Sequence, residues 1–142
     1  MCFALLALSQ HLDYPFILAA NCDEFTDRPA QAMHDWEDIP GVLAGRDMTS
    51  MGSWLALNRN DRRLALVTNV RDGTRQTAER SRGLLIRDLV DTRHEFDASL
   101  QTIVAEQERY AGFNVLAGFI GTGLYYFSNR CLLYTSPSPR DS

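Results

Sequence analysis

Short apolar runs separated by polar residues open the chain. Residues 2–8 and 15–20 are apolar runs of strand length, so we predict two buried strands of one sheet, joined by a turn over residues 10–14. An antiparallel pair brings the polar cluster at residues 21–24 back near the start of the first strand. Cys2 and this cluster are therefore predicted to share one end of a sheet.

Similar patterns continue along the chain. Residues 30–38 fit either a strand or one helical turn, and residues 42–47 fit a short strand. The clearest hairpin consists of residues 52–58 and 63–70, joined by a turn at residues 60–61. Because its second strand is apolar on both faces, we expect that strand to lie inside a layered structure.

The hydrophobic period then changes from that of a strand to that of a helix. Leucine and isoleucine recur at helical spacing from Leu84 to Leu89, and a second amphipathic helix is predicted over residues 96–110. A further hairpin over residues 113–128 follows, with its turn at residues 121–123. Strands, two helices and more strands predict the α+β class, with helices layered on a largely antiparallel sheet.

The last twelve residues, 131–142, differ from the rest of the chain. They have no hydrophobic period, contain Ser-Pro-Ser-Pro, and resemble the translation of an adapter used to prepare sequencing libraries. We therefore predict that this segment is disordered and foreign to the fold, and that residues 1–130 are the N-terminal part of a single domain. On this interpretation Cys131 has no functional role, and the natural chain continues past Arg130.

Composition and charge narrow the class of protein. The 142 residues are 45% hydrophobic and 23% charged, as in a soluble globular domain, and the net charge of −4 favours neither nucleic acid nor an anionic membrane. The apolar run at residues 2–8 is far shorter than the roughly 20 residues of a membrane helix, and no basic residue precedes it as in a secretory signal. We expect a cytoplasmic protein without a membrane span.

Cysteine and histidine spacing predicts no metal site and no cofactor. The three cysteines, at positions 2, 22 and 131, match no metal-binding spacing and cannot form an even set of disulfides. No phosphate-binding glycine loop or dinucleotide motif is present either. The expected partner is therefore a small-molecule substrate.

Cys2 is the strongest candidate for chemistry. If an aminopeptidase removes Met1, Cys2 carries both a thiol and a free α-amine, whose pKa of about 8 suits a general base. The amine can take the thiol proton and later return it to a leaving amine, as in N-terminal nucleophiles. The alternative is that Cys2 is a small apolar residue that opens a buried strand.

Four polar residues near predicted strand ends could support such a nucleophile. Asp23 could hold the α-ammonium and orient the thiol, or it could form only a local turn hydrogen bond. Asn21 and Asn69 each end an apolar strand and could donate to an oxyanion, although such residues usually cap strands or sit in turns. Arg71 could bind a substrate carboxylate or phosphate, or remain solvated.

Short motifs in a fixed order resemble the NRDE-motif family, also called the transport and Golgi organization protein 2 family. The motifs are residues 1–2, 18–25, 27–29, 43–47, 52–56, 68–71, 81–83, 112–114 and 128–130. One departure falls on the name-giving motif, where this chain has Cys22 and the family has arginine. If that arginine contacts the substrate or orients the nucleophile, this chain lacks its contribution.

The resemblance implies a fold like that of the N-terminal-nucleophile hydrolases, a four-layer αββα sandwich of antiparallel sheets between helix layers. These hydrolases cleave non-peptide amide bonds, which gives a first hypothesis: a cysteine amidohydrolase with Cys2, Asn21, Asp23 and Asn69 as catalytic residues and Arg71 as a substrate-binding residue. The family's association with trafficking gives a second, a non-enzymatic protein that handles haem or lipid, with Cys2 as a haem ligand or a structural residue.

Overall fold

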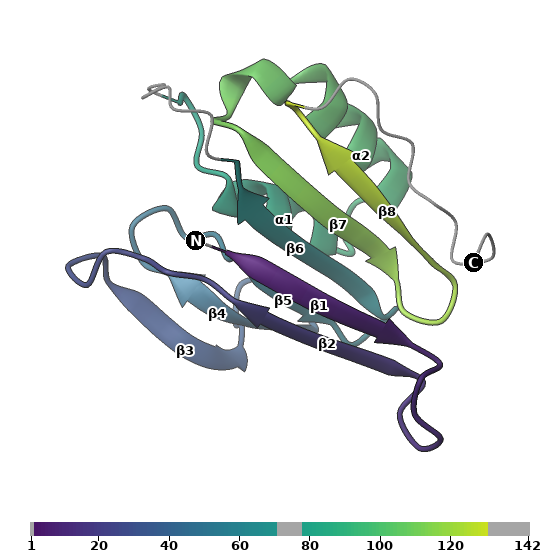
Figure 1. Cartoon of the computed structure of the whole chain (residues 1–142). Helices are drawn as coiled ribbons and strands as arrows, with labels where there is room; N and C mark the ends of the chain where they lie inside the picture. Colours follow the sequence, from purple (N-terminus) through teal and green to yellow (C-terminus); the bar gives the residue numbers. More distant parts are fainter. Residues whose placement is uncertain (1, 71–77, 131–142) are drawn as a thin grey trace.

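The computed structural model describes residues 2–70 and 78–130. Strands occupy both ends of this part of the chain and two α-helices lie between them, which confirms the α+β class (Figure 1). The elements are β1 (Phe3–Leu8), β2 (Phe16–Asn21), β3 (Ala30–Asp35), β4 (Val42–Asp47), β5 (Leu55–Asn58), β6 (Arg63–Asn69), α1 (Gly83–Val90), α2 (Phe96–Ala105), the 3-10 turn η1 (Gln107–Arg109), β7 (Phe113–Phe119) and β8 (Gly123–Ser128). Neither α1 nor α2 has the length and apolar character that a membrane span requires.

The strands form two antiparallel sheets. A two-stranded sheet contains β1 and β2, and a six-stranded sheet has the order β3-β4-β5-β6-β7-β8. Within each sheet every strand therefore pairs with its neighbours in sequence, and α1 and α2 form the connection between β6 and β7. The three predicted hairpins are confirmed. Residues 30–38, which fit either a strand or a helical turn, contain the strand β3.

The two helices pack on one face of the six-stranded sheet. In Figure 1 they lie behind the sheet, and the β1–β2 hairpin lies in front of it. Helix α1 buries Leu85, Ile86, Leu89 and Val90 completely, because residues three and four apart share one side of a helix. These side chains belong to one core with inward-facing residues of the sheet, among them Val67 on β6. This core fixes the position of α1 relative to the end of β6.

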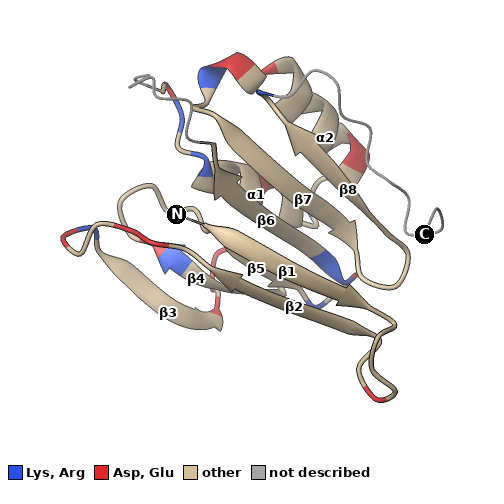
Figure 2. Ribbon diagram, viewed as in Figure 1, with Lys and Arg blue, Asp and Glu red and all other residues tan. Residues whose placement is uncertain are grey.

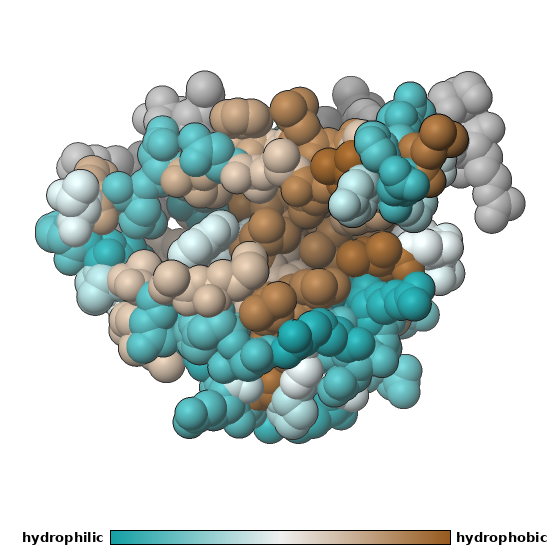
Figure 3. All heavy atoms as spheres, turned by 90° about the horizontal axis from the view of Figure 1, so that it is seen from below, coloured by the Kyte–Doolittle hydropathy of each residue, from teal (hydrophilic) through white to brown (hydrophobic). Residues whose placement is uncertain are grey.

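The prediction that both N-terminal strands are buried is wrong. Phe3 is 51% exposed, Leu5 is 66% exposed and Ile17 is 41% exposed. Both strands are apolar on both faces, which is typical of strands with other elements packed on each face. In the described ranges, however, no helix lies over the hairpin. Figure 3 shows hydrophobic residues gathered along the middle of the face seen from below. The described residues contain one helix layer, so the four-layer sandwich stays a prediction.

Two element boundaries differ from the predicted ones because of tertiary contacts. The strand expected from residue 52 begins only at Leu55, since the backbone at Gly52 packs directly against Gly83. The helix expected to reach residue 110 ends at Ala105 and is followed by η1. The side-chain amide of Asn129 donates to carbonyl groups in and just after η1, a contact that the local sequence pattern does not contain.

Candidate functional site

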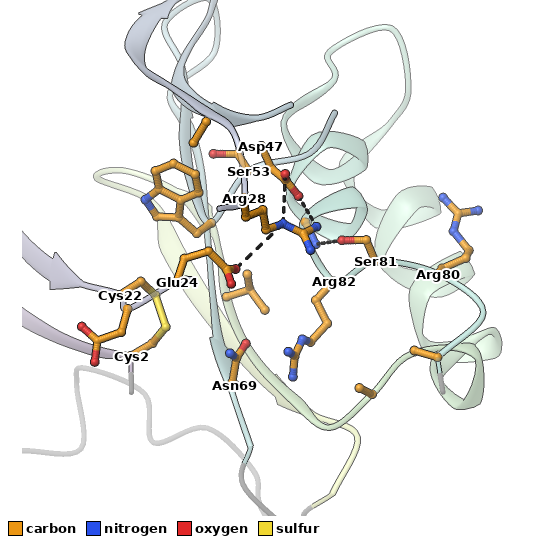
Figure 4. Close-up of a pocket in the computed structure, with 17 residues that line it drawn as sticks. Cys2, Cys22, Glu24, Arg28, Asp47, Ser53, Asn69, Arg80, Ser81 and Arg82 are labelled. Atoms are coloured by element: carbon orange, nitrogen blue, oxygen red, sulfur yellow. Dashed lines mark hydrogen bonds and ion pairs between the residues drawn. A yellow bond between two sulfur atoms is a disulfide. The ribbon is translucent and has the colours of Figure 1, made fainter. Parts of the chain in front are cut away.

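A cavity of about 650 Å³ lies where the hairpin, the end of β6 and the start of α1 meet (Figure 4). Cys2, Asp23 and Asn69 all line it, although they come from three separate parts of the chain. Cys2 directly precedes β1, Asp23 follows β2 and Asn69 ends β6. We call this space the β6–α1 cavity. It brings together three of the five residues that the sequence singles out.

The other two candidates are not in the cavity lining. Asn21 ends β2, pairs with Phe3 of β1 and is exposed, and it is not among the residues that line the β6–α1 cavity. Arg71 lies outside the described residues, as does the segment 131–142 for which disorder is predicted. Within residues 2–70 and 78–130, no three His, Cys, Asp or Glu side chains gather as they would at a metal site.

A disulfide joins Cys2 to Cys22 across the mouth of the hairpin. The expectation that the cysteines form no disulfide set is therefore wrong. Phe3 pairs with Asn21, so the antiparallel register places the residue before β1 opposite the residue after β2, with their Cα atoms 4.1 Å apart. Counting cysteines could not reveal this proximity, but the predicted hairpin, continued by one residue at each open end, would have done so.

An ion pair anchors the loop after β2 to the end of β4. Arg28 donates from Nε and Nη2 to the two carboxylate oxygens of Asp47, at 3.1 and 2.6 Å, and its Nε lies 4.0 Å from a carboxylate oxygen of Glu24. Burial alone would raise the pKa of Asp47, but hydrogen bonds from Arg28, the Ser50 hydroxyl and the Thr49 amide outweigh it and lower that pKa to about 2. The charge of Arg28 is thus largely neutralised within the protein.

Arg82 lines the same cavity, as do Arg28 and Arg80. It is half-buried at the start of α1, and its Nη1 donates to the carbonyl of Gly112 at 2.8 Å. Desolvation lowers the pKa of Arg82, an effect that the distant charge of Glu24 opposes. Among the residues that the structure describes, no carboxylate forms an ion pair with Arg82.

Two glycines hold Arg82 in position. A Cβ atom at Gly52 would lie 2.3 Å from the carbonyl carbon of Gly83, so the two backbones meet where no side chain fits. The amide of Ser53 donates to the carbonyl of Gly83 at 3.1 Å, and the amide of Gly83 donates to the Ser81 hydroxyl at 3.4 Å. These contacts fix the segment that carries Arg82 into the cavity wall.

Charge is distributed unevenly around the cavity. Figure 2 shows acidic residues in the segment after β2 and basic residues in the segment that leads into α1. Arg28, Asp47 and Arg82 occur in the motifs that carry the family resemblance, but their spacing in the sequence indicates no role for any of them. The one local signal is the pair of charged residues, Arg46 and Asp47, that follows the apolar first part of β4.

Comparisons with known proteins agree with the sequence motifs. The family model described as Transport and Golgi organisation 2 matches residues 1–139. The Transport and Golgi organization protein 2 homologs of Bos taurus and Homo sapiens are 34% and 32% identical to this chain over 124 residues, and the Mus musculus homolog is 30% identical. Each alignment covers 82% of this chain and 45% of the relative, so the chain spans about half the length of these curated relatives. The chain therefore belongs to the transport and Golgi organisation 2 family.

Proposed function

We propose that the chain carries the nucleophile of a cysteine amidohydrolase, which cleaves a non-peptide C–N bond in a small molecule. The observation that supports this proposal is the shared cavity: Cys2, Asp23 and Asn69 line one space despite their separation in sequence. A nucleophile, a carboxylate and an amide donor around a cavity of about 650 Å³ are the groups that acyl transfer needs.

The proposed reaction begins with Cys2 as a free N-terminal residue. Its α-amine takes the thiol proton, and the thiolate forms a C–S bond to the amide carbonyl of the substrate. The side-chain amide of Asn69 donates to the oxygen on which negative charge develops, and Asp23 holds the ammonium group in place. The ammonium then protonates the leaving amine as the C–N bond breaks, and a thioester on Cys2 remains.

Water completes the proposed cycle. The α-amine removes a proton from a water molecule, which attacks the thioester carbonyl, and the C–S bond breaks to release a carboxylic acid. The net reaction consumes one amide and one water and yields one acid and one amine. Asn21, which lies outside the cavity lining, is proposed as a positioning residue for the loop that carries Asp23.

The disulfide means that the proposed nucleophile is masked in the oxidised chain. A sulfur bonded to Cys22 has no thiolate to offer, so activity requires reduction. Two equivalents of a small thiol convert the Cys2–Cys22 bond into two thiols and are themselves oxidised to one small disulfide. We therefore assign the proposed activity to the reduced chain without Met1.

The test uses the purified chain and a panel of acyl p-nitroanilides, whose cleavage releases a coloured amine. We expect cleavage after treatment with dithiothreitol, little cleavage before it, and none from Cys2→Ala. Cys22→Ser is the matched control, because it removes the disulfide and keeps the nucleophile, so it should be active without reductant. Mass spectrometry of the same sample reports whether Met1 is removed. Retention of Met1, or equal activity in Cys2→Ala, would refute the mechanism.

One observation favours the second candidate function, a non-enzymatic protein that handles haem or lipid. The exposed side chains of Phe3 and Leu5 give the β1–β2 hairpin an apolar surface close to Cys2. The Cys2 sulfur is bonded to Cys22, so it fits the role of a haem ligand only in the reduced chain. Titration of the reduced chain with haemin tests this candidate: a saturable absorbance change that Cys2→Ser alters would support it.

A further inference from the structure

The charges that line the β6–α1 cavity are not equally satisfied by the protein. Arg28 donates two hydrogen bonds to Asp47 and has Glu24 close by, so its charge is already matched. Arg80, also in the lining, forms an ion pair with Asp88 at 3.4 Å, although its Nε atom is buried without an acceptor in the described ranges. Arg82 differs from both, because its single hydrogen bond goes to a neutral carbonyl, that of Gly112.

A half-buried guanidinium without a carboxylate partner has lost part of its hydration, and no described carboxylate offsets that loss. Arginine does not lose its proton in proteins, so removal from water cannot be relieved by neutralisation. Burial lowers the pKa of Arg82, which is the direction expected for a cation that has lost water and gained little in return. The cavity next to Arg82 is the place from which an anion could reach it.

The geometry of Arg82 selects the kind of anion. Its Nη1 is held by Gly112, whereas Nε and Nη2 donate to no acceptor among the described residues. These two N–H groups form one planar edge that matches the two oxygens of a carboxylate. Figure 4 shows the Arg82 guanidinium beside the Asn69 side chain, and both residues line the cavity with Cys2.

We propose that the β6–α1 cavity binds a carboxylate through Arg82, and hence that the substrate is an amide bearing a carboxylate group. Carboxylate binding stands on the cavity alone, whereas the status of the bound acid as a substrate rests on the proposed function, in which Cys2 attacks the amide. Binding of the carboxylate by Arg82 would hold the amide carbonyl at a fixed distance from Asn69 and Cys2, and so restrict the reaction to acids of one length.

The experiment measures binding rather than activity. N-acetylglycine is titrated into the full chain by nuclear magnetic resonance, with N-acetylglycinamide, which has the same amide and no carboxylate, as the neutral comparison. We expect N-acetylglycine to bind at least ten-fold more tightly than N-acetylglycinamide. Arg82→Gln should abolish that difference, and Arg82→Lys should restore part of it, because lysine keeps the charge and loses the planar pair of donors.

Arg87→Gln is the matched control, since Arg87 lies on α1, the helix that Arg82 directly precedes, pairs with Asp88 and does not line the cavity. It should bind both ligands as the unaltered chain does. Circular dichroism of each variant checks the fold, and if Arg82→Gln is unfolded, the comparison with Arg82→Lys decides. Equal binding of the two ligands, or tight binding of N-acetylglycine by Arg82→Gln, would overturn the proposal.

Two further arms separate the possible outcomes. Inorganic phosphate is titrated in the same way, and binding of phosphate more tightly than N-acetylglycine would overturn the choice of a carboxylate. The second arm is the cleavage assay, run on neutral and acidic amides with the same preparation of the chain. If Arg82-dependent binding is present and no amide is cleaved, the carboxylate site stands and the proposed function fails. If neutral and acidic amides are cleaved equally well, the function stands and the carboxylate site fails.

Discussion

Removal of the Cys2–Cys22 disulfide should destabilise the chain measurably. The bond closes a loop between residues 20 positions apart and so restricts the unfolded chain. For a loop of this length the entropic effect is about 3 kcal/mol. The bond is especially important for the β1–β2 hairpin, because a two-stranded sheet is marginally stable by itself and this hairpin leaves much of its apolar surface exposed.

Urea denaturation of Cys22→Ser, compared with the oxidised chain, measures this effect. Both proteins carry Cys131→Ser so that no third thiol complicates the comparison. With a urea dependence of about 1–3 kcal/mol per molar, a loss of about 3 kcal/mol lowers the midpoint by roughly 1–3 M. Tryptophan fluorescence reports two locations, because Trp36 is 4% exposed in the core and Trp54 is 37% exposed in the cavity lining.

A thiol count before each titration shows whether the disulfide has formed in the oxidised chain. If it has formed and the midpoint nevertheless moves by less than about 0.3 M, the reasoning about loop closure is wrong for this chain. If the fluorescence change shows two transitions instead of one, the chain does not unfold in a single step, and the single-transition treatment is refuted.

Three further substitutions test contacts away from the disulfide. Asn58→Ala should lower stability by about 2–4 kcal/mol in thermal denaturation, because the buried amide donates to the carbonyl of Val90 at 2.8 Å and that carbonyl would lose its donor. Gly52→Ala should lower the melting temperature and weaken N-acetylglycine binding, because its Cβ would lie 2.3 Å from the Gly83 backbone and displace the Arg82 segment. Asp47→Asn should remove a pH dependence of stability, because the folded pKa of Asp47, about 2, lies below its usual value. The ionised Asp47 carboxylate therefore stabilises the folded chain by at most about 2 kcal/mol, and this stabilisation is present above pH 4 and lost as the pH falls toward 2. Denaturation midpoints at pH 2, 3 and 5 check this sign, and a parallel decline in both proteins would contradict it.

Local sequence pattern is sufficient for most elements of the fold. Alternation and turn residues locate the hairpin of β5 and β6 and that of β7 and β8, and helical spacing from Leu84 to Leu89 locates α1. Hydrophobic periodicity locates these elements because the side chains that each one buries recur at the spacing of a strand or a helix. The α+β class then follows from the order of the elements.

Properties that depend on distant residues cannot be predicted in this way. The exposure of Phe3 and Leu5 depends on which layer covers the hairpin, and no pattern within the two strands contains that information. Arg63 is another example: its position suggests the first polar residue of a strand, yet it is buried and donates to the carbonyls of Asp91 and His94 beyond the end of α1. Such residues form their contacts only after the helices fold back on the sheet.

In the candidate site, too, some residues can be predicted from the local sequence and others depend on contacts with distant residues. Cys2, Asp23 and Asn69 can be found in the sequence because strand ends tend to collect polar side chains, and antiparallel pairing of the first two strands is enough to bring Cys2 and Asp23 to one end of a sheet. No sequence signal marks Arg82. Its proposed role in binding depends on the absence of a described carboxylate partner and on the glycine contact that positions it. A sequence shows which charges exist, whereas only the packing shows which of them are matched.

The position of the disulfide has a consequence for how folding of this chain can be followed. Cys2 and Cys22 are opposite each other only when Phe3 pairs with Asn21. A slip of one residue would turn one strand over relative to the other and separate the two sulfur atoms. The fraction of chains that oxidise intramolecularly after dilution from denaturant would therefore count those in which the hairpin has paired correctly, so the chain contains its own chemical reporter of strand alignment.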